Sequence, residues 1–305
     1  ISVATIGDSV DSFGASTAIG IDYVAVGAPD TQSGTGAVFV YYVDSAGTFN
    51  RRPAIRPSDL SANHKFGQDI AMSGDGRYMF VSASGNDKVY VYALVDIPTT
   101  SEVNKTITGA GLPGSYNLEF TPVSIDALNV VDENGKVYLP NKDFTISGTN
   151  ITPTATVLAG VKVVIRQQDY FAHVGTYTGH DTLSGDNFGF SIDCDYYGHY
   201  FVAGAPDSAV ANTDSTVLAG AGEAYVFAQV VERFVGNGTA KAFTTNADLQ
   251  AKIFVEIDGV VQIETDNADV GIDNEGEAFI CSDEMFETLQ MDYLWSYTYD
   301  ENNKL

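Results

Sequence analysis

The chain has 305 residues, of which 40 are acidic and 15 basic, and its formal net charge is −25 at pH 7. Charge of this sign repels nucleic-acid phosphates and anionic lipid surfaces, so neither is an expected partner. Hydrophobic residues make up 44% of the chain, but no apolar run reaches the roughly 18 residues of a membrane span, which predicts a globular protein without membrane insertion.

A motif of three parts recurs in residues 13–41, 66–92 and 188–227. Each copy begins with a Phe-Gly pair, passes through an apolar stretch to a Gly-Ala-Pro turn or a variant of it, and closes with an aromatic stretch. A constant core with variable connections indicates a repeated strand unit with surface loops. The Phe-Gly pairs and Gly-Ala-Pro turns consist of Phe13, Gly14, Gly27, Ala28, Pro29, Phe66, Gly67, Phe188, Gly189, Gly204, Ala205 and Pro206.

The middle and closing stretches of each copy are nearly continuous apolar runs, which is typical of strands buried on both faces. Phe13 and Phe66 lie 53 residues apart, close to the size of one propeller blade. In a propeller each blade packs between two neighbours, so both faces of its sheet are buried. We therefore expect two blades in residues 1–96 and a third blade in residues 170–229.

Residues 97–169 separate the second copy from the third and contain short apolar stretches between turn signals such as Asp132–Gly135. This pattern predicts an inserted small β-sandwich module. A related but truncated β-module is expected in residues 230–267. A possible fourth blade follows in residues 268–305, with strands expected at 278–282 and 293–299, although it lacks the Phe-Gly opening.

The ordered occurrence of Phe-Gly-x-Ser, Gly-Ala-Pro and a closing Gly-x-Val-Tyr-Val-Tyr resembles the FG-GAP repeat of integrin α-subunit propellers and of many bacterial and phage proteins. The resemblance covers about half of the chain, and it implies an all-β fold: an FG-GAP-like β-propeller with inserted β-sandwich modules. Because such propellers usually have seven blades, it also implies that further blades come from other parts of a longer protein or from other chains. The inserted modules resemble those of phage tail-fibre and other virion proteins.

Calcium is the one cofactor that the resemblance raises, because many FG-GAP repeats carry an Asp- and Asn-rich loop. Asp193 and Asp195 stand at alternate positions, as oxygen ligands of this hard cation do, but the rest of a ligand set is missing. A solvated turn is the favoured interpretation, with calcium as the alternative. The same two interpretations apply to a second acidic cluster, formed by Asp266, Asp269, Asp273 and Glu275.

No catalytic constellation stands out. The histidines form no metal pair, and surface or turn positions are expected for His64, His173, His180 and His199. Cys194 and Cys281 are expected to be small core residues, with a disulfide between them as the alternative. Three tyrosines beside one turn are interpreted as core or turn support, with a rim for glycan or protein as the alternative: Tyr196, Tyr197 and Tyr200.

These patterns favour a structural or adhesive protein over an enzyme. The expected function is that of a phage virion component, such as a tail fibre or baseplate part, in which a propeller is the binding scaffold. Its expected partners are other virion proteins and a host surface protein or glycan, within a larger assembly. One alternative is an extracellular adhesin on a bacterial or archaeal cell surface, and another is a propeller hydrolase acting on glycans.

Overall fold

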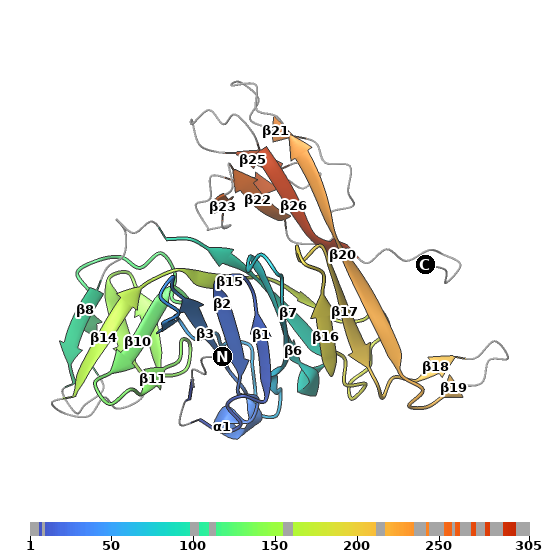
Figure 1. Cartoon of the computed structure of the whole chain (residues 1–305), viewed down its shortest axis with the longest axis horizontal. Helices are drawn as coiled ribbons and strands as arrows, with labels where there is room; N and C mark the ends of the chain where they lie inside the picture. Colours follow the sequence, from blue (N-terminus) through green and yellow to red (C-terminus); the bar gives the residue numbers. More distant parts are fainter. Residues whose placement is uncertain are drawn as a thin grey trace.

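The computed structural model describes residues 6–7, 10–97, 104–109, 114–154, 161–211 and 217–234, together with strand segments at 242–243, 253–257, 260–262, 270–272, 278–280 and 289–296. The described residues form several antiparallel sheets, none of them closed into a barrel, and a short helix, α1 (Thr31–Gly34). The all-β prediction is therefore confirmed. Three of the sheets stack in succession along the molecule (Figure 1).

The three stacked sheets each contain one copy of the sequence motif. The first sheet has the order β1-β2-β3-β4, the second β15-β7-β6-β5, and the third begins β16-β17-β20-β26 and continues with β22 and β23. Their strands are β1 (Ser16–Ile19), β2 (Tyr23–Gly27), β3 (Val38–Val43), β4 (Phe49–Arg51), β5 (Phe66–Met72), β6 (Tyr78–Ala83), β7 (Lys88–Val95), β15 (Tyr170–Tyr177), β16 (Ser191–Cys194), β17 (Tyr200–Ala205), β20 (Glu223–Phe234), β22 (Ile253–Ile257), β23 (Val260–Gln262) and β26 (Leu289–Ser296).

The Phe-Gly pair has the same two roles in each sheet. Its glycine adopts a left-handed backbone conformation, with φ of 92° at Gly14, 85° at Gly67 and 80° at Gly189, which side chains with a Cβ rarely adopt. Its phenylalanine packs against an aromatic ring of the third strand of the same sheet. The ring pairs are Phe13 with Phe39, Phe66 with Tyr90, and Phe188 with Tyr225, with centroids 5.5, 5.4 and 5.4 Å apart.

The second sheet lies between the first and the third, so both of its faces are buried. Successive side chains of its strands point to opposite faces and therefore enter different cores. On β6, Met79 and Val81 join a core with the first sheet, whereas Phe80 joins a core with the third sheet. The rings of Phe80 and Phe201 lie 5.0 Å apart across the latter interface. The continuous apolar runs of the sequence are explained by this double burial.

The stretch predicted as an inserted module forms two facing sheets, with orders β11-β10-β14-β8 and β12-β13-β9. Side chains of both sheets share one core, which includes Leu118, Leu128, Phe144 and Ile165. We call this unit, residues 104–167, the sandwich. Its strands are β8 (Asn104–Thr108), β9 (Tyr116–Asn117), β10 (Leu128–Asp132), β11 (Val137–Tyr138), β12 (Phe144–Ser147), β13 (Asn150–Pro153) and β14 (Lys162–Gln167).

The structure corrects the expected boundary at residue 170. β15 pairs antiparallel with β7, from Tyr170 opposite Val95 to Tyr177 opposite Val89, and therefore belongs to the second sheet. The chain leaves at the end of β7 and returns beside it, where the Ile97 N–H donates to Asp169 Oδ1 at 2.8 Å. The sandwich thus interrupts the second sheet between its third and fourth strands, instead of separating one sheet from the next.

The third sheet is interrupted at the same place. β20 pairs with β17 over its first half and with β26 over its second half, so the intervening module again begins after a third strand. β26 also pairs with β22, whereas β25 (Ala278–Ile280) pairs with β21 (Ala242–Phe243) and β24 (Val270–Ile272). In the described residues, the two strands expected in a fourth blade thus pair with other strands, and β26 belongs to the third sheet. A short hairpin of β18 (Val210–Ala211) and β19 (Val217–Leu218) completes the described strands.

Candidate ligand-binding site

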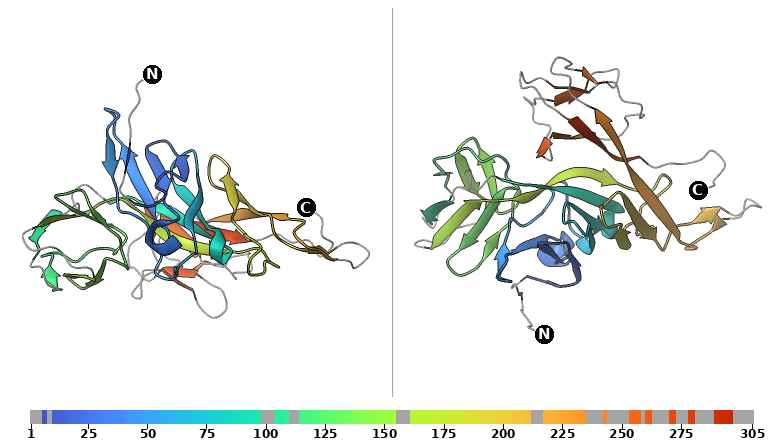
Figure 2. Two further views of the ribbon diagram at one scale, coloured as in Figure 1. Left: turned by 90° about the horizontal axis from the view of Figure 1, so that it is seen from below. Right: turned by 45° about the horizontal axis from the view of Figure 1, so that its top comes forward.

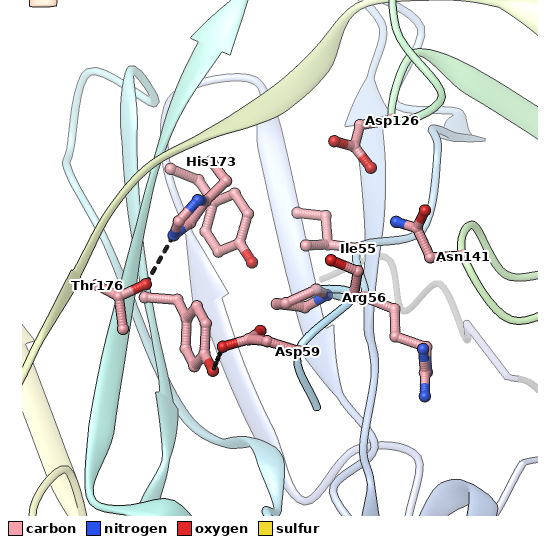
Figure 3. A pocket seen from close by; sticks show the side chains of 11 residues that line it. Ile55, Arg56, Asp59, Asp126, Asn141, His173 and Thr176 are labelled. Carbon is pink, nitrogen blue, oxygen red and sulfur yellow. Dashed lines mark hydrogen bonds between the residues drawn. The ribbon is translucent and has the colours of Figure 1, made fainter. Parts of the chain in front are cut away.

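A pocket of about 280 Å³ lies where the first two sheets meet the sandwich (Figure 3). Residues 55–59, which connect the first sheet to the second, form one wall, and β7 and β15 form another. Asp126 and Asn141 of the sandwich complete the lining. The sandwich is held here because its Leu139 packs into the core of the first sheet and its Asn129 amide donates to the Arg51 carbonyl at 3.0 Å.

Two tyrosines at alternate positions of β7 form the inner wall. The Tyr90 hydroxyl donates to Asp59 Oδ2 at 3.0 Å. The Tyr92 hydroxyl is buried and has no hydrogen-bond partner among the residues that the structure describes, and burial raises its pKa well above the ordinary value. Their rings are fixed by Phe66, whose centroid lies 5.4 Å from that of Tyr90 and 6.2 Å from that of Tyr92.

A β-bulge in β15 brings His173 and Thr176 to the same side of the sheet. The register shifts between His173 and Gly175, so that His173 lies opposite Tyr92 and Thr176 lies opposite Tyr90. His173 Nε2 and Thr176 Oγ1 are 2.9 Å apart. The exposed imidazole therefore stands over the two tyrosine rings, with centroids 5.5 and 5.7 Å away. Surface placement was expected for this histidine, but its position in a pocket was not.

Asp126 is the most perturbed carboxyl group of the pocket. Burial alone raises its pKa from 3.8 to about 6. Asn141 lies beside it, and the guanidinium of Arg56 points away from His173 and Asp59 (Figure 3). Asp59 forms an ion pair of 3.5 Å with Lys88, whose side chain is partly exposed. The inner pocket therefore presents mainly oxygen atoms and tyrosine rings.

Asp193 and Asp195 lie away from this pocket, in the third sheet and its β16–β17 turn. Asp193 Oδ1 accepts from the Cys194 N–H at 2.9 Å, and Asp195 Oδ1 accepts from the Tyr200 N–H at 2.8 Å. Each carboxylate thus has a local backbone donor, as in a solvated turn. Within the residues that the structure describes, no group of three or more His, Cys, Asp or Glu side chains could hold a metal ion. The calcium alternative for this pair stays a prediction.

The neighbouring tyrosines are exposed, and one of them supports a contact between sheets. Tyr196, Tyr197 and Tyr200 have exposed fractions of 58, 55 and 56%. The Tyr196 carbonyl accepts from the Asp75 N–H of the second sheet at 3.3 Å. Cys194 is a free thiol, and burial, followed by the charges of three nearby aspartates, raises its pKa to about 12. Cys281 and the acidic cluster of residues 266–275 lie outside the residues with described side chains.

No protein-family model matches the chain, and no curated protein matches it. In the part that the structure describes, none of the helices has the length and apolar character needed to cross a membrane. The stacking of the sheets and the chemistry of the pocket are therefore the features from which a function can be inferred.

Proposed function

We propose that this chain is a structural and adhesive component of a phage virion, built on an FG-GAP-like β-propeller. The observation that carries the proposal is the way in which one sheet covers the next. Side chains at equivalent positions of β2, β6 and β17 point in the same direction along the stack, which we call forward. In the first two sheets, the sheet that follows buries these side chains.

The forward face of the third sheet has no such cover among the described residues. Tyr78 and Phe80 of the second sheet are buried against the third sheet, with exposed fractions of 9 and 0%. By alignment on the Gly-Ala-Pro turn, the equivalent residues are Tyr200 and Val202, which are 56 and 38% exposed. Val226 on the adjacent strand β20 is 42% exposed. An apolar strand face of this kind supports the addition of a further sheet.

The glycines of the turns support the same conclusion. A Cβ at Gly27 would lie 2.2 Å from the carbonyl oxygen of Gly67, so the Phe-Gly pair of the second sheet requires a glycine there. The equivalent Gly204 meets nothing closer than the Ser191 carbonyl at 3.8 Å. The equivalent position of the second sheet is Ser82, whose Cβ would lie 3.1 Å from a Cβ on Gly189, so a small residue stands beside the following Phe-Gly pair in both covered sheets. The space at Gly204 is open for a further pair of this kind. A propeller continued in this way is a rigid scaffold whose loops are free for partners.

The two interruptions support an adhesive or spacing role. Both modules start where the third strand of a sheet ends, and Figures 1 and 2 show them as bodies beside the stack. Modules attached in this way extend the surface of the scaffold without breaking the contacts between sheets. The high negative charge favours solubility of such an assembly and disfavours nucleic-acid partners.

Antibodies against the purified chain, applied to gradient-purified phage particles and to cell-envelope fractions of the source culture, test the proposal. We expect the chain in the particles at constant stoichiometry, and an electron cryomicroscopy map with a sheet covering Tyr200 and Val202. Detection only in the cell envelope would overturn the virion assignment in favour of the cell-surface adhesin. An uncovered third sheet in the native assembly would overturn the propeller.

A further inference from the structure

The pocket between the second sheet and the sandwich has unused hydrogen-bonding capacity in its inner part. Tyr92 is 3% exposed, and in the described part of the chain its hydroxyl has no hydrogen-bond partner. Native structures pair most buried hydroxyl groups, because an unpaired one has lost its hydrogen bonds to water without replacement. A buried orphan group that lines a cavity is therefore a sign of a ligand.

The lining of the cavity carries two carboxylates, Asp59 and Asp126, against one guanidinium, that of Arg56. Ionised Asp59 and Asp126 accept only, and Tyr92 accepts as well as donates. His173 and Thr176 already share one hydrogen bond. The faces of tyrosine rings attract cations, and the guanidinium of Arg56 points away from His173 and Asp59 (Figure 3). These features disfavour an anion and favour a ligand that brings N–H donors and positive charge.

The outer lining favours a hydroxylated ligand over a plain amine. Asn141 is exposed and offers both a donor and an acceptor, and Thr176 retains hydrogen-bonding capacity beside His173. Hydroxyl groups also donate and accept, so they match these side chains, whereas an alkyl chain would leave them without a role. The volume of about 280 Å³ lies just below the range of roughly 300–1,000 Å³ for drug-sized ligands and therefore suits a single sugar ring.

We propose that this pocket binds a saccharide unit carrying a free amino group, with the ammonium directed to Asp126 and the Tyr92 hydroxyl and the sugar hydroxyls directed to Asn141 and Thr176. The biological meaning of this assignment rests on the proposed adhesive function, because an amino sugar would then be part of a recognised surface glycan. Its chemistry rests on the pocket alone.

Isothermal titration calorimetry of the purified full chain at pH 7.5 tests the assignment with glucosamine, glucose and ethylamine as probes. Glucosamine and glucose differ in one amino group, and ethylamine carries the ammonium without the sugar. We expect glucosamine to bind at least tenfold more tightly than either of the other two probes. Equal binding of glucose would overturn the ammonium contact, and equal binding of ethylamine would overturn the sugar.

Variants locate the binding and keep it separate from folding. Asp126→Asn is expected to weaken glucosamine binding at least tenfold, and Tyr92→Phe about threefold or more. Both remove an unfavourable buried group and should fold, which circular dichroism checks. Asp22→Asn and Tyr196→Phe, at exposed positions outside the pocket, are the matched controls and should bind as the unmodified chain does.

Unchanged binding by Asp126→Asn, or equal losses in it and Asp22→Asn, would overturn the site. Because these titrations use the isolated chain, they do not depend on where the chain occurs. Binding by a chain found only in cell envelopes would leave the pocket assigned and the virion proposal wrong. A chain found in particles that binds no glucosamine would leave the virion proposal supported and the pocket assignment wrong.

Discussion

Asp126→Asn is expected to change how the stability of the protein depends on pH. The pKa of Asp126 rises from 3.8 to about 6 on folding because burial disfavours the ionised carboxylate. One pKa unit corresponds to about 1.36 kcal/mol, so the ionised group costs the folded state up to about 3 kcal/mol. The folded protein binds this proton more tightly than the unfolded chain, so its contribution is favourable at low pH and is lost as pH rises through about 6.

The measurement is thermal or urea unfolding of the unmodified chain and of Asp126→Asn at several pH values between 4 and 8. Asparagine cannot ionise, so the variant should gain stability relative to the unmodified chain as pH rises, up to about 3 kcal/mol above pH 7. His173 and the other carboxylates are present in both proteins, so their titrations largely cancel in the difference. Asp22→Asn, at an exposed turn, is the control for the chemistry of the substitution itself.

A stability difference between Asp126→Asn and the unmodified chain that stays constant from pH 4 to pH 8 would refute this reasoning. It would mean that Asp126 is as well solvated in the folded protein as in the unfolded chain. If the stability of Asp126→Asn relative to the unmodified chain fell as pH rises, the predicted direction of the pKa shift would be wrong. Such a result would require a partner that stabilises the Asp126 carboxylate.

Three further predictions concern the stack of sheets and the free thiol. Gly27→Ala should lower the melting temperature by several degrees in thermal scans, because its Cβ would meet the Gly67 carbonyl. Gly204→Ala, whose Cβ would have no close contact, should shift the melting temperature by less than about 1 °C. Similar shifts for both variants would contradict the packing of the first sheet on the second. Asp87→Ala should destabilise the protein by at least about 1.5–3 kcal/mol in urea unfolding, because the Asp87 carboxylate accepts from the Gly185 and Phe188 N–H groups at 2.9 and 3.0 Å. Cys194, with its pKa raised to about 12, should react with iodoacetamide at pH 8 far more slowly in the native chain than in urea, as followed by peptide mass spectrometry, and fast native labelling would contradict its burial.

The local features of the repeat could be predicted from the sequence. All three Phe-Gly pairs have a left-handed glycine, and the rings of Phe66 and Phe188 are fully buried while that of Phe13 is partly buried. The continuous apolar runs around Phe80 and Val91 likewise indicate strands buried on both faces. The short strands of residues 104–167 correspond to the short apolar stretches between turn signals.

The pocket could not be predicted in the same way, because its parts come together only in the folded chain. The tyrosines of β7 carried a packing signal, but nothing near Asp126 or Asn141 in the sequence indicates that the sandwich folds back against the first sheet. The bulge that places His173 over Tyr92 is an irregularity of pairing between strands far apart in the chain.

The repeated strand unit and the sandwich follow from local features of the sequence, because strand patterning and the conformational demands of glycine are local. Which strand completes each sheet becomes visible only in the folded chain. β15 and β26 find their partners across the inserted modules through backbone hydrogen bonds, and these bonds depend little on side-chain identity. For the same reason only the structure shows where the modules attach, and with them where the pocket lies.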